Sequence, residues 1–286
     1  MSYILLFASV FIDTFKNIYY NQFGNSVLKS NRDAILFNVV CGIGASAFFL
    51  ASGCGFKISS FSLAAAAVFA AVTAMAQYFS LMSMSCGSMS YSVLFTYLGM
   101  IIPTLFGIFF YKQSVSPLQI VGLLLMLVTL FCGAGVKKGE KVNVKWLIFA
   151  FGSFVMWGLV GVIQQIHQNS RFAGEIKVFL FWSFVFLTAI FTAMYLIMPK
   201  SGKSGYKLKS KSTVPSIISG IIIGAVNLIN LYLSGKLPSI VLFPILNGGV
   251  IVLSGLAAII FFKERLSKSQ YIGIALGIAA VCLLGM

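Results

Sequence analysis

Two charged residues could do chemistry inside an apolar stretch near the start of the chain. Asp13 and Lys16 follow the apolar run from Ile4 to Ile12, which we expect to be a membrane helix rather than a cleaved signal. Because they are three residues apart, they share one face of a helix. A charge in hydrocarbon is costly and usually faces a cavity or an ionic partner. Asp13 could therefore bind a proton, a cation or a substrate amine, with Lys16 as a second coupling candidate; alternatively, the two charges neutralise each other.

Uncharged polar side chains interrupt several other apolar stretches. Together with Asp13, we expect the following residues to line a substrate cavity: Asn17, Tyr20, Gln77, Tyr97, Trp157, Gln164, Asn227, Asn230 and Asn247. Amides, phenols and an indole would hold a polar or zwitterionic small molecule by hydrogen bonds. The same groups also form hydrogen bonds between membrane helices, which is the alternative interpretation for each of them.

The groups needed for enzymatic catalysis are scarce. The chain has five acidic residues and one histidine, His167, and no nucleophile–histidine–acid set or pair of carboxylates can be drawn at membrane depth. Its five cysteines form no CxxC pair, so we expect no metal site and no cofactor. No GxxxxGK[ST] motif is present, which argues against direct use of ATP. The sequence therefore predicts a protein that is not an enzyme.

The composition indicates an all-α polytopic membrane protein. Of 286 residues, 59% are hydrophobic and 9% are charged, whereas a soluble domain is about half apolar and about a quarter charged. A membrane-spanning helix needs about 20 mostly apolar residues. Such stretches cover approximately residues 2–22, 34–53, 60–83, 88–111, 117–135, 145–166, 175–198, 213–234, 238–262 and 269–286, which predicts ten transmembrane helices.

Basic residues concentrate in the tracts between these stretches. The chain carries 20 Lys and Arg against 5 Asp and Glu. In short loops such cations meet anionic lipid head groups, so we expect membrane lipids and no nucleic acid as partners. Loops after the odd-numbered stretches carry most of these cations. The positive-inside rule then puts both termini outside the cytoplasm. The expected location is the inner (plasma) membrane.

An internal repeat relates the two halves of the chain. The segment from Phe110 to Gly122 aligns with the segment from Phe261 to Gly273. The identical pairs are Phe110/Phe261, Lys112/Lys263, Ser116/Ser267, Gln119/Gln270 and Gly122/Gly273. Each copy joins the last two helices of a five-helix set. We therefore divide the chain into a first repeat (1–136), a basic connecting loop (137–145) and a second repeat (146–286).

Because five is odd, two successive five-helix repeats must cross the membrane in opposite directions. Inverted repeats of this kind are a recurrent architecture of secondary transporters. When the two halves exchange conformations, a central site that was open to one side of the membrane opens to the other. Pro103 and Pro244 should interrupt the fourth and ninth helices and are candidate hinge or gate positions. Gly220-xxx-Gly224 could pack helices within the chain, and Gly273-xxx-Gly277 could form the face of a homodimer.

The two repeat junctions resemble those of EamA-like proteins in the drug/metabolite transporter superfamily. The run from Phe262 to Ser267 is similar to the motif that ends a repeat in that family, and Trp157-Gly158 is similar to its Trp-Gly pair. Asp13 and Gln113 depart from the pattern, where a Trp and a Glu are usual. The resemblance implies a carrier of small organic solutes with a central cavity between its halves and, contrary to the charge count, termini in the cytoplasm.

Taken together, these features predict a secondary active transporter that moves a small polar or amphipathic metabolite by alternating access. A multidrug or metabolite exporter of the same superfamily is one alternative. A membrane-embedded enzyme or lipid-handling scaffold without solute flux is another, from a different class.

Overall fold

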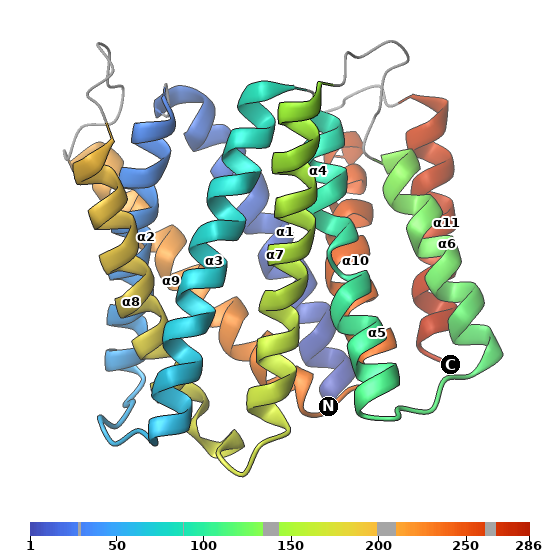
Figure 1. The fold of residues 1–286 in the computed structure, drawn as a ribbon. Coiled ribbons are helices and arrows are strands. Elements are labelled where there is room, and N and C mark those ends of the chain that lie inside the picture. Colours follow the sequence, from blue (N-terminus) through green and yellow to red (C-terminus); the bar gives the residue numbers. More distant parts are fainter. Residues whose placement is uncertain (28–29, 88, 134–142, 199–209, 261–266) are drawn as a thin grey trace. The chain divides into compact units, whose positions relative to one another are not determined.

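The computed structural model describes residues 1–286 except for 28–29, 88, 134–142, 199–209 and 261–266 (Figure 1). All regular structure in the described residues is helical. The helices are α1 (Ser2–Val27), α2 (Asn31–Ala51), α3 (Ser60–Cys86), α4 (Met89–Leu98), α5 (Ile101–Phe110), α6 (Pro117–Gly133), α7 (Val144–Gln168), the short 3₁₀ helix η1 (Ala173–Glu175), α8 (Ile176–Ile197), α9 (Ser210–Ser234), α10 (Ser239–Ile260) and α11 (Lys268–Leu284).

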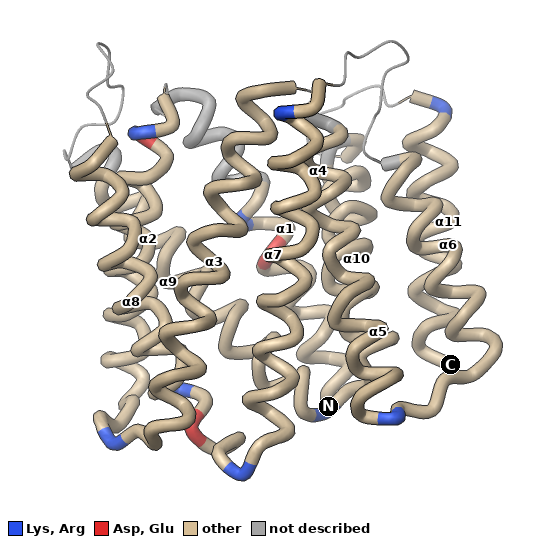
Figure 2. The backbone as a smooth tube through the Cα atoms, in the orientation of Figure 1, with Lys and Arg blue, Asp and Glu red and all other residues tan. Residues whose placement is uncertain are grey.

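Several of these helices are long and apolar enough to cross a membrane. Within the described ranges there are seven such spans, at 31–51, 60–86, 91–110, 144–168, 173–197, 213–234 and 239–257. α6 and α11 are shorter apolar helices. The described Lys and Arg residues lie mainly at helix ends, as membrane-surface loops require (Figure 2). These observations confirm an all-helical, multi-pass membrane protein.

The stretch expected as one membrane helix over 88–111 is a single apolar span at 91–110, and it is broken between α4 and α5, which confirms the interruption expected at Pro103. Pro103 has no N–H to donate to the carbonyl of Gly99, four residues earlier. The N–H of Ile102 donates to that carbonyl instead, at 3.1 Å, which tightens the chain between the two helices. The interruption expected at Pro244 is wrong, because α10 continues through this buried proline.

The described chain forms two compact units, each built from segments distant in sequence. The first contains residues 1–14, 75–165 and 233–286, and the second contains residues 15–74 and 166–232. In the second unit, α2 packs against α8, with the rings of Phe49 and Phe184 stacked at 6.0 Å. Both units draw on both halves of the sequence, so the repeat boundaries at 136 and 146 stay a prediction.

Close approach between helices depends on particular glycines. In the first unit, Gly277 on α11 is buried, and a Cβ there would collide with Val252 of α10 and approach Thr129 of α6. The Gly273-xxx-Gly277 motif is therefore used for packing inside the chain, which contradicts its expected place on a dimer face. In the second unit, a Cβ on Gly220 would collide with the carbonyl of Cys41, which confirms internal packing for the other glycine motif.

Candidate functional site

Four polar side chains of the first unit meet where α3, α4 and α7 pack together. We call Ser80, Thr96, Ser153 and Trp157 the hydroxyl cluster. The indole N–H of Trp157 donates to Ser80 Oγ at 3.0 Å. Ser153 Oγ lies 2.8 Å from Ser80 Oγ and 2.9 Å from Thr96 Oγ1. Ser153 is fully buried, whereas the other three are half-buried.

The hydroxyl cluster has more acceptor capacity than donors. Ser80 donates to the carbonyl of Ala76 at 2.9 Å, and Thr96 donates to that of Ser92 at 3.1 Å, so both protons are bound to their own helices. The remaining hydroxyl proton, on Ser153, can point to only one of its two neighbours at a time. Oxygen lone pairs are therefore left over, and these can accept hydrogen bonds from the N–H or O–H groups of a bound solute.

Small residues let the three helices approach closely enough to form this cluster. A Cβ on Gly99 would come within 2.9 Å of the carbonyl of Phe154, and one on Gly158 would come within 2.5 Å of Ile102 Cδ1. Ser153 and Trp157 are four residues apart on α7, so both project from the same face toward α3 and α4. In the Trp-Gly pair, Trp157 therefore donates a hydrogen bond, and Gly158 allows close packing against Ile102.

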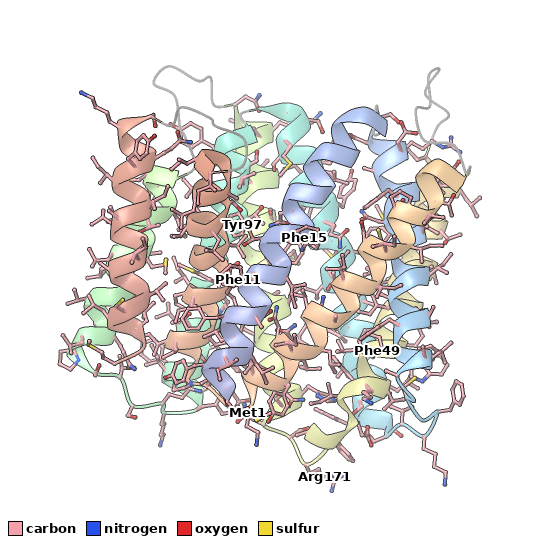
Figure 3. The ribbon with its side chains drawn as sticks, turned by 180° about the vertical axis from the view of Figure 1, so that it is seen from behind. Met1, Phe11, Phe15, Phe49, Tyr97 and Arg171 are labelled. Atoms are coloured by element: carbon pink, nitrogen blue, oxygen red, sulfur yellow. The ribbon has the colours of Figure 1, made fainter. Side chains whose placement is uncertain are left out.

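Among the residues expected to bind substrate, Trp157 is in the hydroxyl cluster itself. Gln77 and Tyr97 are half-buried on α3 and α4, the helices that supply Ser80 and Thr96 (Figure 3 labels Tyr97). Gln164, two turns beyond Trp157 on α7, is buried. Asn247 on α10 is half-buried and donates to the carbonyl of Phe243 at 2.9 Å, within its own helix.

The other expected site residues belong to α1 and to the second unit. Asn227 and Asn230 are half-buried on α9, and Asn227 donates to the carbonyl of Ile223 at 2.9 Å. Asn17 is half-buried on α1, and the side chain of Tyr20 lies outside the described part of the chain. The structure therefore does not gather all the expected substrate residues into one described cluster.

Asp13 and Lys16 lie on α1 as expected for a shared helical face, and both are half-buried. Asp13 lies between Phe11 and Phe15 in the sequence, and Lys16 follows Phe15; both aromatic side chains are 62% exposed and are labelled on α1 in Figure 3. α1 thus carries its two charges beside exposed aromatic side chains. The coupling role of the two charges stays a prediction.

A second polar network joins α5, α7 and α10 in the first unit. Gln165 is buried; its Nε2 donates to the carbonyl of Pro103 at 2.7 Å, and its Oε1 accepts from Ser239 Oγ at 2.8 Å. The N–H of Ser239 donates to Gln113 Oε1 at 2.8 Å, so Gln113 caps the first turn of α10. The preceding residue, Lys112, has a φ of 48°, an uncommon backbone conformation for a residue with a side chain.

The sequence signals for these groups are weak. Serine and threonine are common in apolar helices, where they usually donate to a carbonyl of their own helix. The departure of Gln113 from the usual junction residue could have drawn attention to the capping contact. Among the described residues, no group of three or more His, Cys, Asp or Glu side chains could hold a metal ion.

Comparison with known proteins agrees with this structure. A curated protein of Haemophilus influenzae, described as uncharacterized, is 27% identical over 196 residues, which cover 65% of this chain and 63% of that protein. The match thus spans less than two thirds of that relative's length. A protein of known crystal structure is similar to this chain with a TM-score of 0.77 and 15% sequence identity. The similarity covers 99% of this chain and 95% of that protein, and it shows the fold alone.

Residues 144–286, half of the chain, match the family model described as the EamA-like transporter family. They include α7, which carries Trp157 and Gln165, and all helices that follow it. The chain belongs to the EamA-like transporter family, within the drug/metabolite transporter superfamily.

Proposed function

We propose that the protein is a secondary carrier that moves a small polar metabolite across the inner (plasma) membrane by alternating access. The hydroxyl cluster is the observation that carries this proposal, because it places an indole N–H and three hydroxyls among otherwise apolar helices. Membership of a transporter family supports it. We further propose ten transmembrane helices in two inverted five-helix repeats, residues 1–136 and 146–286, on the strength of the repeated junctions in the sequence.

The chemistry of the cluster favours a neutral or zwitterionic solute. No described Asp, Glu, Lys or Arg side chain contributes to it, so a net charge on the solute would have no partner there. Its spare hydroxyl oxygens accept hydrogen bonds, which favours solutes with several N–H or O–H donors, such as amino acids, amino alcohols, nucleosides or sugars. Gln77 and Tyr97, on the same helices, extend the polar lining in this proposal.

Opening and closing would use the Gln165 network at the junction of α5, α7 and α10. Pro103 lies beside the break between α4 and α5, and its carbonyl accepts from Gln165. Rotation of α5 about this break would separate Pro103 from Gln165 and expose one end of the carrier. Pro244 is also a proposed hinge, but only for bending of α10, since the helix continues through it.

Asp13 is the proposed coupling residue on α1, with Lys16 as its companion. Replacing Asp13 with asparagine should abolish accumulation of solute against its gradient, because the side chain can no longer exchange a proton or pair with a cation. Downhill exchange of solute should continue, since the hydroxyl cluster is unchanged. The measurement is concentrative against exchange flux in proteoliposomes. Concentrative flux at the wild-type rate would remove Asp13 from the coupling mechanism.

Binding can be tested before any flux is known. The purified protein would be screened by thermal unfolding with amino acids, amines, nucleosides and sugars, since a ligand that binds the folded state raises its unfolding temperature. We expect a stabilising solute among the donor-rich neutral or zwitterionic compounds. A Ser153→Ala variant, which loses the buried hydroxyl, should lose this shift. Equal stabilisation of both proteins would place the binding site elsewhere.

A further inference from the structure

The second unit contains a buried chain of hydrogen bonds that the proposed transport site does not use. The imidazole of His167, at the end of α7, is fully buried, and its Nε2 lies 3.1 Å from the hydroxyl of the fully buried Ser62 on α3. The N–H of Ser62 donates to Ser59 Oγ at 3.2 Å. Ser59 in turn donates its N–H at 3.1 Å and its hydroxyl at 2.8 Å to the carboxylate of Glu175.

Aromatic side chains cover the imidazole. The ring of Phe179 stacks on it with centroids 4.2 Å apart, and that of Phe61 lies parallel at 6.5 Å. Glu175, in contrast, is half-buried at the start of α8. Among the described contacts of this unit, Ser59 and Ser62 therefore connect the half-buried Glu175 carboxylate to the buried ring. The connection that follows α7 also carries the exposed Arg171, labelled in Figure 3.

Hydrogen-bond donors and acceptors along the chain specify a neutral imidazole. Gln168 Nε2 lies 3.2 Å from His167 Nδ1 and 3.4 Å from the carbonyl of Ala173, and it can donate to both. Nδ1 then carries no proton, so the proton is on Nε2 and is donated to Ser62 Oγ.

An additional proton on Nδ1 would break this pattern. Both ring nitrogens of an imidazolium are donors, so the Gln168 amide would have to turn its oxygen toward the ring. The carbonyl of Ala173 would then lose its donor. Proton uptake would therefore rearrange the connection between α7 and α8. Because α7 also carries Trp157 and Gln165, this rearrangement is placed on a helix that serves the proposed transport site.

Glu175 is the charged group that faces the imidazole. The other charged side chains near it are bound elsewhere: the Arg171 guanidinium lies 4.7 Å from the ring centre of Phe172, and Lys177 Nζ donates to the carbonyl of Ser52 at 2.8 Å. A negative carboxylate near the ring stabilises a proton on it. We propose that His167, with Ser62, Ser59 and Glu175, is a proton-binding site of the carrier: Nδ1 takes one proton from water during transport, Nε2 keeps its own proton on Ser62, and the Glu175 carboxylate offsets the positive charge of the imidazolium.

This inference rests on the proposed carrier function for its role in transport, but proton binding can be measured without any solute. His167 is the only histidine in the sequence, so ¹⁵N-labelled histidine gives a single imidazole whose signals need no assignment. The full-length protein in lipid nanodiscs would be titrated from alkaline to acidic pH. We expect a neutral ring protonated on Nε2, followed by one transition to the doubly protonated ring.

Variants of the chain define the expected change. Glu175→Gln should displace the half-point of this transition toward acidic pH by about one pH unit, because the imidazolium loses its negative neighbour. Ser62→Ala should displace it in the same direction. Lys177→Gln is the matched control, since it removes a nearby charge that belongs to a different contact, and should leave the half-point unchanged. A ring that stays neutral throughout, or that titrates identically in Glu175→Gln and wild type, would overturn the proposal.

The link to transport has its own measurement. Once the thermal screen has identified a solute, its flux into proteoliposomes would be followed with and without a pH gradient. Wild type should respond to the gradient, and His167→Gln should lose this response while still exchanging solute. An equal response in both proteins would overturn the coupling role of His167. Normal titration without any solute flux would leave the proton site standing and instead contradict the proposed carrier function.

Discussion

Replacing Trp157 with phenylalanine is expected to reduce solute flux about tenfold, a loss of about 1.4 kcal/mol, which is typical of one buried hydrogen bond. The indole N–H of Trp157 donates to Ser80 Oγ at 3.0 Å, and phenylalanine keeps the aromatic bulk but not this donor. Ser80 would then be held only by its neighbouring hydroxyls. The measurement is the initial rate of flux in proteoliposomes containing equal amounts of folded protein.

Trp182 on α8 provides a matched control for this substitution. Its indole nitrogen is buried and has no hydrogen-bond partner in the described part of the chain. Trp182→Phe therefore removes the same atoms without removing a hydrogen bond, and flux should remain near the wild-type rate. Equal losses in the two variants would mean that the Trp157 N–H has no specific role in binding solute.

Replacing Gly220 with alanine is expected to lower the stability of the folded protein strongly, by about 1–3 kcal/mol or more, as overpacking of a tight interior does. A Cβ at this position would collide with the backbone carbonyl of Cys41 on α2, and backbone cannot turn aside as a side chain can. The neighbouring thiol of Cys41 contacts the carbonyl of Ser216 at 3.3 Å, so α2 and α9 are already joined at this level. Thermal unfolding in detergent and the yield of monodisperse protein would report the loss.

Gly224 lies one helical turn further along α9 and offers the comparison. The atom nearest to a Cβ added at Gly224 would be Phe48 Cδ1, at 3.0 Å, and this atom belongs to a side chain that can shift. Gly224→Ala should therefore cost clearly less stability than Gly220→Ala. If Gly224→Ala were the more damaging of the two, the close contact between α9 and α2 would have been placed at the wrong glycine.

The membrane-spanning character could be predicted from the sequence because it depends on local composition. Apolar runs of sufficient length form helices in a membrane wherever their neighbours lie, since only an internally hydrogen-bonded backbone is stable there. The division between α4 and α5 needed one further step, namely that Pro103 leaves the carbonyl of Gly99 without its usual donor. The proline itself gave this signal and the interruption was expected, but the same reasoning failed at Pro244, where α10 continues.

The polar clusters could not be predicted in the same way, because they join residues far apart in sequence. Ser80 and Trp157 are separated by 77 residues, and Ser62 and His167 by 105. Nothing in the local pattern distinguishes Ser80 or Ser62 from other serines in apolar helices. Trp157 was predicted from its family motif, and Asn227 and Asn247 from their polar side chains; in the structure these asparagines donate to carbonyls of their own helices.

The central claim is that this chain carries a small polar solute through the membrane, and solute counterflow tests it most directly. Proteoliposomes preloaded with the stabilising compound from the thermal screen would be diluted into a trace of its radiolabelled form. We predict transient, saturable uptake of label into wild-type vesicles, about tenfold slower initial uptake with Trp157→Phe, and none into empty liposomes. Uptake no greater than in empty liposomes, despite clear binding of the compound, would contradict the carrier function.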